Sequence, residues 1–427
     1  MKGHNKCTTI GGDRGTQVFK GAGGKQLRNQ MNCRNNGNFV KDEFYLEVRI
    51  SWYQTQHHGS LAGPLCRDHE RSNLLQFKES FVIDQSASIE PTAYPKVASW
   101  TLEGNNSDCC SWDGVECDEV TGHVIGLDLN SSCLYGSINS NSSLFHLFLH
   151  LNDCGLHGEF PIGIFKLPNL QVLDVQYNKG LTGYLPDFQQ SSPLEEMLLA
   201  NTSFSGKLPA SMGNLGSLTA IDTWNCNFSG NKLTGQIPFG LTNLTQLTFL
   251  ELVGNNLAGQ IPSSINNLKN LEFLDLSSNN FSGTVEFDKF VKLKKLTTLH
   301  LSYNGISLLT SETSGNTTLQ KFQNLGLYSC NLSKFPDFLA NQDELQWLDL
   351  GDNNFHGQVP GWFWNVSKES LEVIDLSDNF LTSLGQHPIL LPWTRLAILD
   401  LRSNKLQGSL PIPSFSTLRL LGIKPYS

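Results

Sequence analysis

Long apolar runs are missing from this chain of 427 residues. No stretch approaches the roughly 18 consecutive apolar residues that a membrane-spanning helix needs. The first 60 residues also lack the basic, apolar and small-residue regions that make up a secretory signal peptide. We therefore expect contact with a membrane only through a spanning helix that this sequence does not contain.

Basic residues are scarce as well. The chain has 30 Lys and Arg against 39 Asp and Glu, which gives a net charge of -9 at pH 7. A nucleic-acid binder needs a basic face to neutralise phosphates. The charge balance therefore argues against a nucleic-acid partner.

Catalytic patterns are also missing. The eleven His residues are scattered, and no Ser stands in a nucleophile-elbow context. One aspartate recurs at a fixed place along the chain, which we call the aspartate row: Asp128, Asp174, Asp222, Asp275, Asp349, Asp375 and Asp400. Paired carboxylates can do acid–base chemistry, but a residue that recurs with a repeat is better explained as a solvent-facing position of that repeat. We predict no enzymatic activity, no cofactor and no metal site.

A repeat dominates what is present. Its clearest copy is the stretch LEFLDLSSNNFSGTV, residues 271–285, in which Leu271, Leu274 and Leu276 are followed by Asn279 and Gly283. The frame LxxLxLxxNxLxGxIP is the signature of a leucine-rich-repeat solenoid. Each unit supplies one short strand and cannot bury its own apolar face, so neighbouring units must stack into a continuous core.

The repeats predict about twelve strands in one parallel sheet of an α/β solenoid with a right-handed superhelix. Successive inward leading positions are 22 to 29 residues apart. They are Leu127, Leu149, Leu173, Met197, Ile221, Leu250, Leu274, Leu299, Leu325, Leu348, Ile374 and Leu399.

An asparagine follows most of these strands at one inward position. The members of this asparagine ladder are Asn178, Asn255, Asn279, Asn304, Asn353, Asn379 and Asn404. Buried backbone groups between stacked turns need partners, and a side-chain amide can supply them. In three repeats the same position is Cys154, Cys226 or Cys330, which we interpret as small buried substitutes and not as nucleophiles.

The chain divides into four parts. Residues 1–60 are expected to be a disordered or mis-assigned leader, 61–121 an N-terminal cap, 122–411 the solenoid, and 412–427 a truncated, frayed repeat. The cap should contain a helix with Asp68 at its N-cap and with Leu74, Phe77 and Phe81 on one face.

Four cap cysteines are candidate staples of this unit. Cys66, Cys109, Cys110 and Cys117 allow three pairings. Because adjacent cysteines rarely bridge each other, we favour Cys66–Cys109 with Cys110–Cys117. Zinc binding is the alternative, but Cys-Cys-x6-Cys without a nearby His is poor zinc spacing.

The cap sequence LCRDHERSNLLQFKESF…CCSWDGVECD, followed by LxLxxNxLxGxIP units, resembles the extracellular part of plant leucine-rich-repeat receptor-like proteins of the disease-resistance (Cf) type. The resemblance covers about residues 61–411. It implies an ectodomain fragment on the outer side of the plasma membrane that perceives a ligand for defence or development. It also implies a peptide or protein ligand and signalling through a co-receptor kinase. The alternatives are a secreted inhibitor of a cell-wall-degrading enzyme, similar to polygalacturonase inhibitors, and a truncated decoy that does not signal.

Ligand contacts are expected on the concave face of the sheet, where side chains between the inward leucines project. We predict Trp224 and Tyr328 to be exposed there as aromatic anchors. The candidate ligand-binding residues are Gln176, Trp224, Phe249, Phe273, Ser302, Tyr303, Tyr328, Trp347 and Arg402.

Glycosylation sequons support a secretory origin. Asn-x-Ser/Thr occurs at Asn105, Asn130, Asn141, Asn201, Asn227, Asn243, Asn280, Asn316, Asn331 and Asn365.

Overall fold

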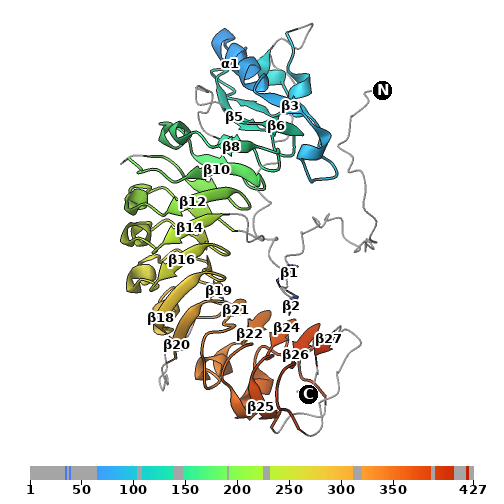
Figure 1. The fold of residues 1–427 in the computed structure, drawn as a ribbon, viewed down its shortest axis with the longest axis vertical. Coiled ribbons are helices and arrows are strands. Elements are labelled where there is room, and N and C mark those ends of the chain that lie inside the picture. Colours follow the sequence, from blue (N-terminus) through green and yellow to red (C-terminus); the bar gives the residue numbers. More distant parts are fainter. Residues whose placement is uncertain are drawn as a thin grey trace.

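The computed structural model describes residues 65–102, 108–138, 148–189, 192–224, 231–310, 320–385 and 390–407. It also describes the backbone of three short strand segments: β1 (Arg34–Asn35), β2 (Asn38–Phe39) and β27 (Leu420–Gly422). Figure 1 shows the repeats stacked in a curved array from the cap, in blue, to the C-terminal strands, in red. The expected leader, residues 1–60, lies outside the described residues apart from the antiparallel pair β1–β2.

One long sheet follows the inner side of the curve (Figure 1). All twelve expected strands are present and parallel, with the inward positions in register: Leu274 pairs with Leu250 and with Leu299. They are β5 (Val124–Asp128), β7 (Phe148–His150), β9 (Val172–Asp174), β11 (Glu196–Leu198), β13 (Ala220–Asp222), β15 (Phe249–Glu251), β17 (Phe273–Asp275), β19 (Thr298–His300), β21 (Asn324–Gly326), β22 (Trp347–Asp349), β24 (Val373–Asp375) and β26 (Ile398–Asp400).

Two further strands extend the sheet to 14 strands. At the N-terminal end, β4 (Val115–Cys117) pairs antiparallel with β5. At the other end, β27 pairs with β26 and places Leu421 opposite Leu399. Residues 420–422, within the segment expected to be a truncated repeat (412–427), therefore add one more parallel strand.

A second sheet runs beside the first and was not predicted. Its seven parallel strands are β8 (His157–Glu159), β10 (Gly180–Tyr184), β12 (Ser203–Lys207), β14 (Lys232–Gly235), β16 (Asn256–Gly259), β18 (Asn280–Glu286) and β20 (Gly305–Leu309). The pair β23 (His356–Gln358) and β25 (Phe380–Ser383) repeats the arrangement further along. Most of these strands carry the LxG part of their repeat, with Phe replacing Leu in β12 and β18. Gly259 shows why glycine recurs there: its φ is +82°, and a Cβ would lie 2.8 Å from the Gln236 side chain.

Short helices complete most repeats and lie along the outer side of the array (Figure 1). Each 3₁₀ turn begins directly after the Pro of the repeat, whose fixed φ suits the first helical turn. They are η5 (Ile162–Lys166), η6 (Ala210–Asn214), η7 (Phe239–Asn243), η8 (Ser263–Asn267), η9 (Asp337–Asn341) and η10 (Gly361–Asn365), with the α-helical turn α2 (Asp288–Val291) between β18 and β19. Within the described ranges, no helix has the length and apolar character to cross a bilayer.

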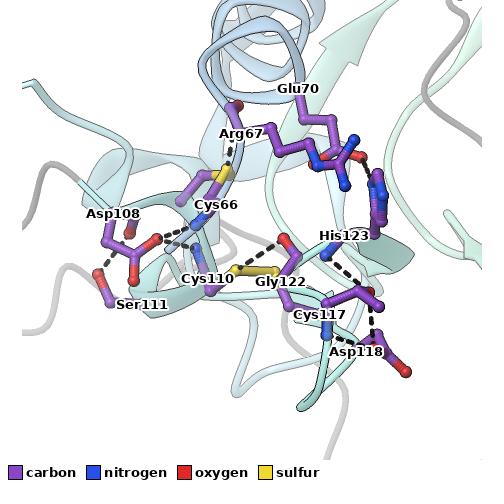
Figure 2. Close-up of a disulfide and its surroundings, with 12 residues drawn as sticks. Cys66, Arg67, Glu70, Asp108, Cys110, Ser111, Cys117, Asp118, Gly122 and His123 are labelled. Carbon is purple, nitrogen blue, oxygen red and sulfur yellow. Dashed lines mark hydrogen bonds and ion pairs between the residues drawn. A yellow bond between two sulfur atoms is a disulfide. The ribbon is translucent and has the colours of Figure 1, made fainter. Parts of the chain in front are cut away.

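The cap holds a helix and two disulfides, and Figure 2 shows the Cys110–Cys117 bridge with its surroundings. The predicted pairing is confirmed: Cys66 bridges Cys109, and Cys110 bridges Cys117. Three of these sulfurs lie within 4.8 Å of one another, but all three are already bonded in disulfides, which removes them as metal ligands. Asp108 ties the two bridges together, because its Oδ1 accepts the N–H groups of Cys66 and Cys110.

The cap helix is shorter than predicted. Helix α1 covers Asp68–Lys78, and its N-cap is Arg67, not Asp68. Phe81 lies in β3 (Phe81–Ile83), which pairs antiparallel with β6 (Leu134–Gly136). The Phe77 and Phe81 rings still touch edge to face, with centroids 4.8 Å apart. Short 3₁₀ turns, η1 (Gln85–Ala87), η2 (Lys96–Ser99) and η4 (Cys109–Ser111), connect the helix to β4.

The cap core rests on stacked tryptophans. The Trp100 and Trp112 rings lie 5.7 Å apart, and both are buried. Cys133, beside β6, is also disulfide-bonded, whereas Cys154 and Cys330 are free and buried.

The asparagine ladder joins each repeat to the one before it. Asn353 Nδ2 donates to the carbonyls of Leu327, Leu350 and Gly351 at 2.9 to 3.0 Å, and its Oδ1 accepts the N–H groups of Cys330 and Leu332. One buried side chain therefore satisfies five backbone groups in two repeats.

Cysteine fills the ladder position with fewer bonds. The Cys154 thiol lies 2.9 Å from the carbonyl of Leu129 and 3.3 Å from that of Asn152, the same two places in the repeat that ladder asparagines contact. The Cys330 thiol faces the carbonyls of Leu301 and Tyr328 in the same way. The prediction that these two cysteines are ladder residues is confirmed.

The repeat that contains the third cysteine is arranged differently. Cys226 lies outside the described residues, and Asn231 makes the ladder bonds of its repeat. Asn231 Nδ2 donates to the carbonyls of Leu199 and Thr223, and its Oδ1 accepts the N–H of Phe204. Asn231 stands ten residues after the inward Ile221, whereas Asn178 stands five after Leu173. The long 29-residue interval is therefore an insertion between the strand and its ladder asparagine.

Replacing Asn353 by Ala should lower the free energy of unfolding by about 3 kcal/mol, because buried carbonyl and N–H groups lose their partners. The adjacent Asn354→Ala is the matched control and should cost under about 0.5 kcal/mol, since among the described residues its amide bonds the exposed Asn331 alone. Urea titration of both variants measures the difference. Equal losses would contradict the ladder role.

Candidate functional site

On the inner, concave face of the long sheet, three rows of side chains point away from the hydrophobic core. In β17, Leu274 is buried inward, whereas Phe273 before it is half-buried on the inner face of the sheet. The aspartate row follows the inward residue, and a third row lies two residues later. The structure therefore brings the predicted ligand-binding residues onto one face, although they span residues 176–402.

The aspartate row is part of the scaffold. Asp275 Oδ1 accepts the N–H of Ser277 at 2.8 Å, and Asp222 Oδ1 accepts that of Trp224 at 2.9 Å. The same carboxylate-to-N–H bond, two residues along, recurs at Asp128, Asp174, Asp349, Asp375 and Asp400. These carboxylates end each strand in the manner of an Asx turn.

Burial makes two of these carboxyls hard to ionise. It raises the pKa of Asp222 to about 7, against the lowering effect of the Trp224 N–H and with a further rise from Asp174. Burial likewise raises the pKa of Asp275 to about 6. Gln176 donates its side-chain amide to the other oxygen of Asp222, so this predicted ligand contact is committed to the scaffold.

Aromatic side chains stack in pairs across neighbouring strands. Phe249 and Phe273, on β15 and β17, have ring centroids 4.4 Å apart and an interplanar angle of 14°. Trp347 stacks on His300 at 4.7 Å, although their strands are separated by β21. Gly326 on β21 makes this possible, because a Cβ there would lie 3.1 Å from both rings.

His300 is held neutral beneath Trp347. Burial lowers the pKa of its imidazole to about 3. Its Nδ1 lies 3.3 Å from Asp275 Oδ2, which places an uncharged imidazole beside the carboxyl of the previous repeat.

A third stacked pair is formed by Tyr303 and Tyr328, with centroids 4.5 Å apart. Tyr328 is only 8% exposed, so its predicted exposure was wrong. Its ring lies flat over Gly351 of the next repeat, where a Cβ would come within 2.7 Å. Its hydroxyl is directed at Asp378 Oδ2, 3.4 Å away.

The remaining candidates differ in availability. Ser302 is 4% exposed, and its Oγ accepts the N–H of Tyr328, so it is buried in the scaffold. Arg402 is half-buried and donates its Nε to both oxygens of Asp400 at 2.9 Å. Trp224 is half-buried.

Sequence reasoning missed four residues that shape this face: His300, Gly326, Gly351 and Asp378. The sequence did carry a signal for two of them: Gly326 and Gly351 are glycines in rows that are otherwise filled by larger side chains. Such a glycine permits a neighbouring ring to lie across its strand.

The sequons lie in different environments. Asn243, Asn280, Asn331 and Asn365 are exposed and lie away from the three inner-face rows. Asn130 is half-buried, and its Oδ1 accepts the N–H of Asn152. Asn201 is 2% exposed, with φ at +56°. Asn105, Asn141, Asn227 and Asn316 lie outside the described residues.

Glycan occupancy should follow this exposure. In protein secreted from a plant host, glycopeptide mass mapping should find glycans at Asn243, Asn280, Asn331 and Asn365 and none at Asn201, because a glycan there would unpack the strand. The control variant Asn243→Gln should lose one glycan and leave the other sites unchanged. A glycan on Asn201 in folded protein would contradict this placement.

Asp222→Asn should stabilise the protein most above pH 7. The pKa of Asp222 is higher in the folded state than in the unfolded state, so the folded protein binds the proton more tightly. The free energy of unfolding therefore falls as pH rises from about 4 to about 7. The variant's melting temperature should therefore exceed that of the wild type at pH 8 and converge with it near pH 4. The exposed Asp337→Asn is the control and should show no such convergence. A constant difference between Asp222→Asn and the wild type at all pH values would refute the assignment.

Comparison with known proteins agrees with this architecture. Residues 184–424 match the family described as "Leucine-rich repeat region", and residues 67–118 match "Leucine rich repeat N-terminal domain". Receptor-like protein 49 of Arabidopsis thaliana is 30% identical over 84% of this chain and 51% of its own length. The chain spans 60% and 51% of the length of the first two curated relatives it matches.

Solved structures show the same fold. The ectodomain of the Arabidopsis thaliana receptor kinase GASSHO1/SCHENGEN3, in complex with CASPARIAN STRIP INTEGRITY FACTOR 2, has a TM-score of 0.53 and 28% identity over 79% of this chain and 36% of that chain. The Arabidopsis receptor kinase HAESA, in complex with the peptide hormone IDA and the co-receptor SERK1, has a TM-score of 0.52 and 24% identity over 84% of this chain and 70% of that chain.

The capped solenoid, the paired cap cysteines and the sequence identity along most of the chain lead to one conclusion. This chain belongs to the plant leucine-rich-repeat receptor-like proteins, a family that is not enzymatic.

Proposed function

We propose that this chain is a ligand-perceiving ectodomain of a plant cell-surface receptor, which binds a peptide or protein along the inner face of the long sheet and signals through a partner kinase. The observation that carries this proposal is the series of stacked aromatic pairs on that face: Phe249–Phe273, His300–Trp347 and Tyr303–Tyr328. Large, partly exposed rings held by neighbours lose little entropy on binding, and such rings dominate protein interfaces.

The geometry suits an extended ligand. Consecutive parallel strands lie about 4.8 Å apart, and the three pairs extend from β15 to β22. A partner that runs across the strands can therefore contact several repeats at once. The exposed sequons lie away from these rows, which leaves the inner face open to a partner.

The relatives support this choice of ligand class. The GASSHO1/SCHENGEN3 ectodomain was solved with CASPARIAN STRIP INTEGRITY FACTOR 2, and HAESA with a peptide hormone and a co-receptor. We extend the combination of ectodomain, peptide and co-receptor to the present chain, at the plasma membrane; the stacked aromatic pairs are our reason for placing the peptide on the inner face.

Peptide display on the chain tests the proposal. Peptides selected for binding should lose about thirtyfold affinity, about 2 kcal/mol, with Phe273→Ala or Trp347→Ala, because each change removes a ring from the proposed interface. Phe239→Ala is the matched control, since Phe239 is 67% exposed and begins η7 on the outer side. The affinity of the Phe239→Ala variant for the selected peptides should stay within about twofold of the wild type.

Thermal melting of each variant shows whether it is folded. Selected peptides that bind all three variants equally would overturn the assignment of the inner face.

A further inference from the structure

One part of the inner face combines aromatic rings with carboxylates. We call it the tyrosine–aspartate patch. Its members are Tyr303, Tyr328, Asp349, Asp352, Asp375 and Asp378. They come from four consecutive repeats, whose inner strands are β19, β21, β22 and β24.

The aromatic part is a fixed platform. Tyr303 is 38% exposed, and its covered face stacks on Tyr328. Tyr328 is held in turn by Gly351 beneath it and by Asp378 at its hydroxyl. The exposed side of Tyr303 is therefore presented in one orientation, as cation–π or stacking contacts require.

The carboxylates give this platform a negative field. Asp352 is exposed and Asp378 is half-buried, and neither has an ion pair in the described part of the chain. Burial raises the pKa of the Tyr303 hydroxyl, and Asp349, Asp375, Asp352 and Asp378 raise it further. Four carboxylates therefore act on one tyrosine.

Small residues lie beneath this region. Gly326, Gly351 and Ser377 are buried in the rows between the aromatic and acidic side chains. The Tyr328 ring and the His300–Trp347 pair occupy the space above Gly351 and Gly326, so a ligand side chain can reach this patch only from the exposed side of Tyr303.

The same field already surrounds a guanidinium at its C-terminal border. Hydrogen bonds to Asp400 raise the pKa of Arg402, and Asp375 and Asp378 raise it further. Arg402 donates its Nε to Asp400 and, among the described residues, makes no hydrogen bond or ion pair to Asp352 or Asp378.

We propose that the tyrosine–aspartate patch binds an arginine side chain of an extended peptide ligand, with the guanidinium stacked on Tyr303 and its N–H groups donated to the carboxylates of Asp352 and Asp378. The inference rests on the proposed function and names the chemistry of one part of the ligand. Arginine fits better than lysine because its planar, weakly hydrated guanidinium stacks on an aromatic ring and donates several directed hydrogen bonds at once.

The test uses three capped hexapeptides in which glycine alternates with arginine, lysine or glutamate. In isothermal titration calorimetry with the full chain at about 0.15 M salt, the arginine peptide should bind most tightly and the lysine peptide more weakly. The glutamate peptide should not bind. The double variant Asp352→Asn/Asp378→Asn should bind the arginine peptide about tenfold more weakly. Tyr303→Leu should weaken it about threefold.

A charge-matched control separates the patch from the general field of the protein. Glu344→Gln/Glu369→Gln removes the same charge from exposed positions outside the inner-face rows, and its affinity should stay within about twofold of the wild type. Three results would each overturn the inference: no binding of the arginine peptide, no preference for arginine over lysine, or an equal loss in both double variants.

Photo-crosslinking distinguishes this failure from failure of the proposed function. Display-selected peptides that carry a benzophenone and crosslink to the inner-face strands, without enrichment in arginine, would end the inference and leave the proposed function standing. Crosslinks confined to the outer side would end both. Arginine-rich peptides whose crosslinks fall on β19 to β24 would support both.

Discussion

Most repeats of this protein depend on a buried asparagine that bonds backbone groups of its own turn and of the previous repeat. The tight turn that ends each inner strand leaves carbonyl and N–H groups with no ladder partner. Asn353 shows the solution, because one amide meets three carbonyls and two N–H groups. No repeat is complete alone, so each is stabilised by contact with its neighbours, and the first repeat by contact with the disulfide-bonded cap.

The same turn sets the backbone of the inner face. The residue before the ladder position adopts a positive φ in most repeats, as in Ser278 (53°), Tyr303 (57°) and Asp378 (55°). A positive φ raises the conformational energy of most residues other than glycine. The ladder bonds and the aspartate that precedes them hold the turn in place. Tyr303 therefore stands at a position whose direction is fixed by the scaffold.

The inner face is consequently a set of prearranged contacts. Gly326 and Gly351 allow Trp347 and Tyr328 to lie flat across neighbouring strands, and these rings in turn fix His300 and Tyr303. Side chains that are ordered before binding lose less entropy when a partner arrives. The arrangement explains how an extended solenoid face can offer a specific surface.

The sequence by itself determined the repeat register, the strand positions, the cap pairing and most of the asparagine ladder. These features follow from local spacing: the inward leucines, the asparagine five residues later and the four cap cysteines are all readable along the chain. Spacing failed at Asn231, where an insertion moved the ladder residue away from Cys226. It also failed at β27 and at the second sheet, whose strands are defined by pairing with neighbouring repeats.

Only the tertiary structure decided which predicted contact residues are available. Alternation along a strand predicts that Tyr328 and Ser302 face outward, but it cannot say what covers them. Tyr328 is buried because Gly351, in the next repeat, leaves space for its ring, and Ser302 is buried because its hydroxyl accepts the N–H of Tyr328. The direction of a side chain is a local property of the strand, whereas its exposure depends on the size of a neighbour about 25 residues away.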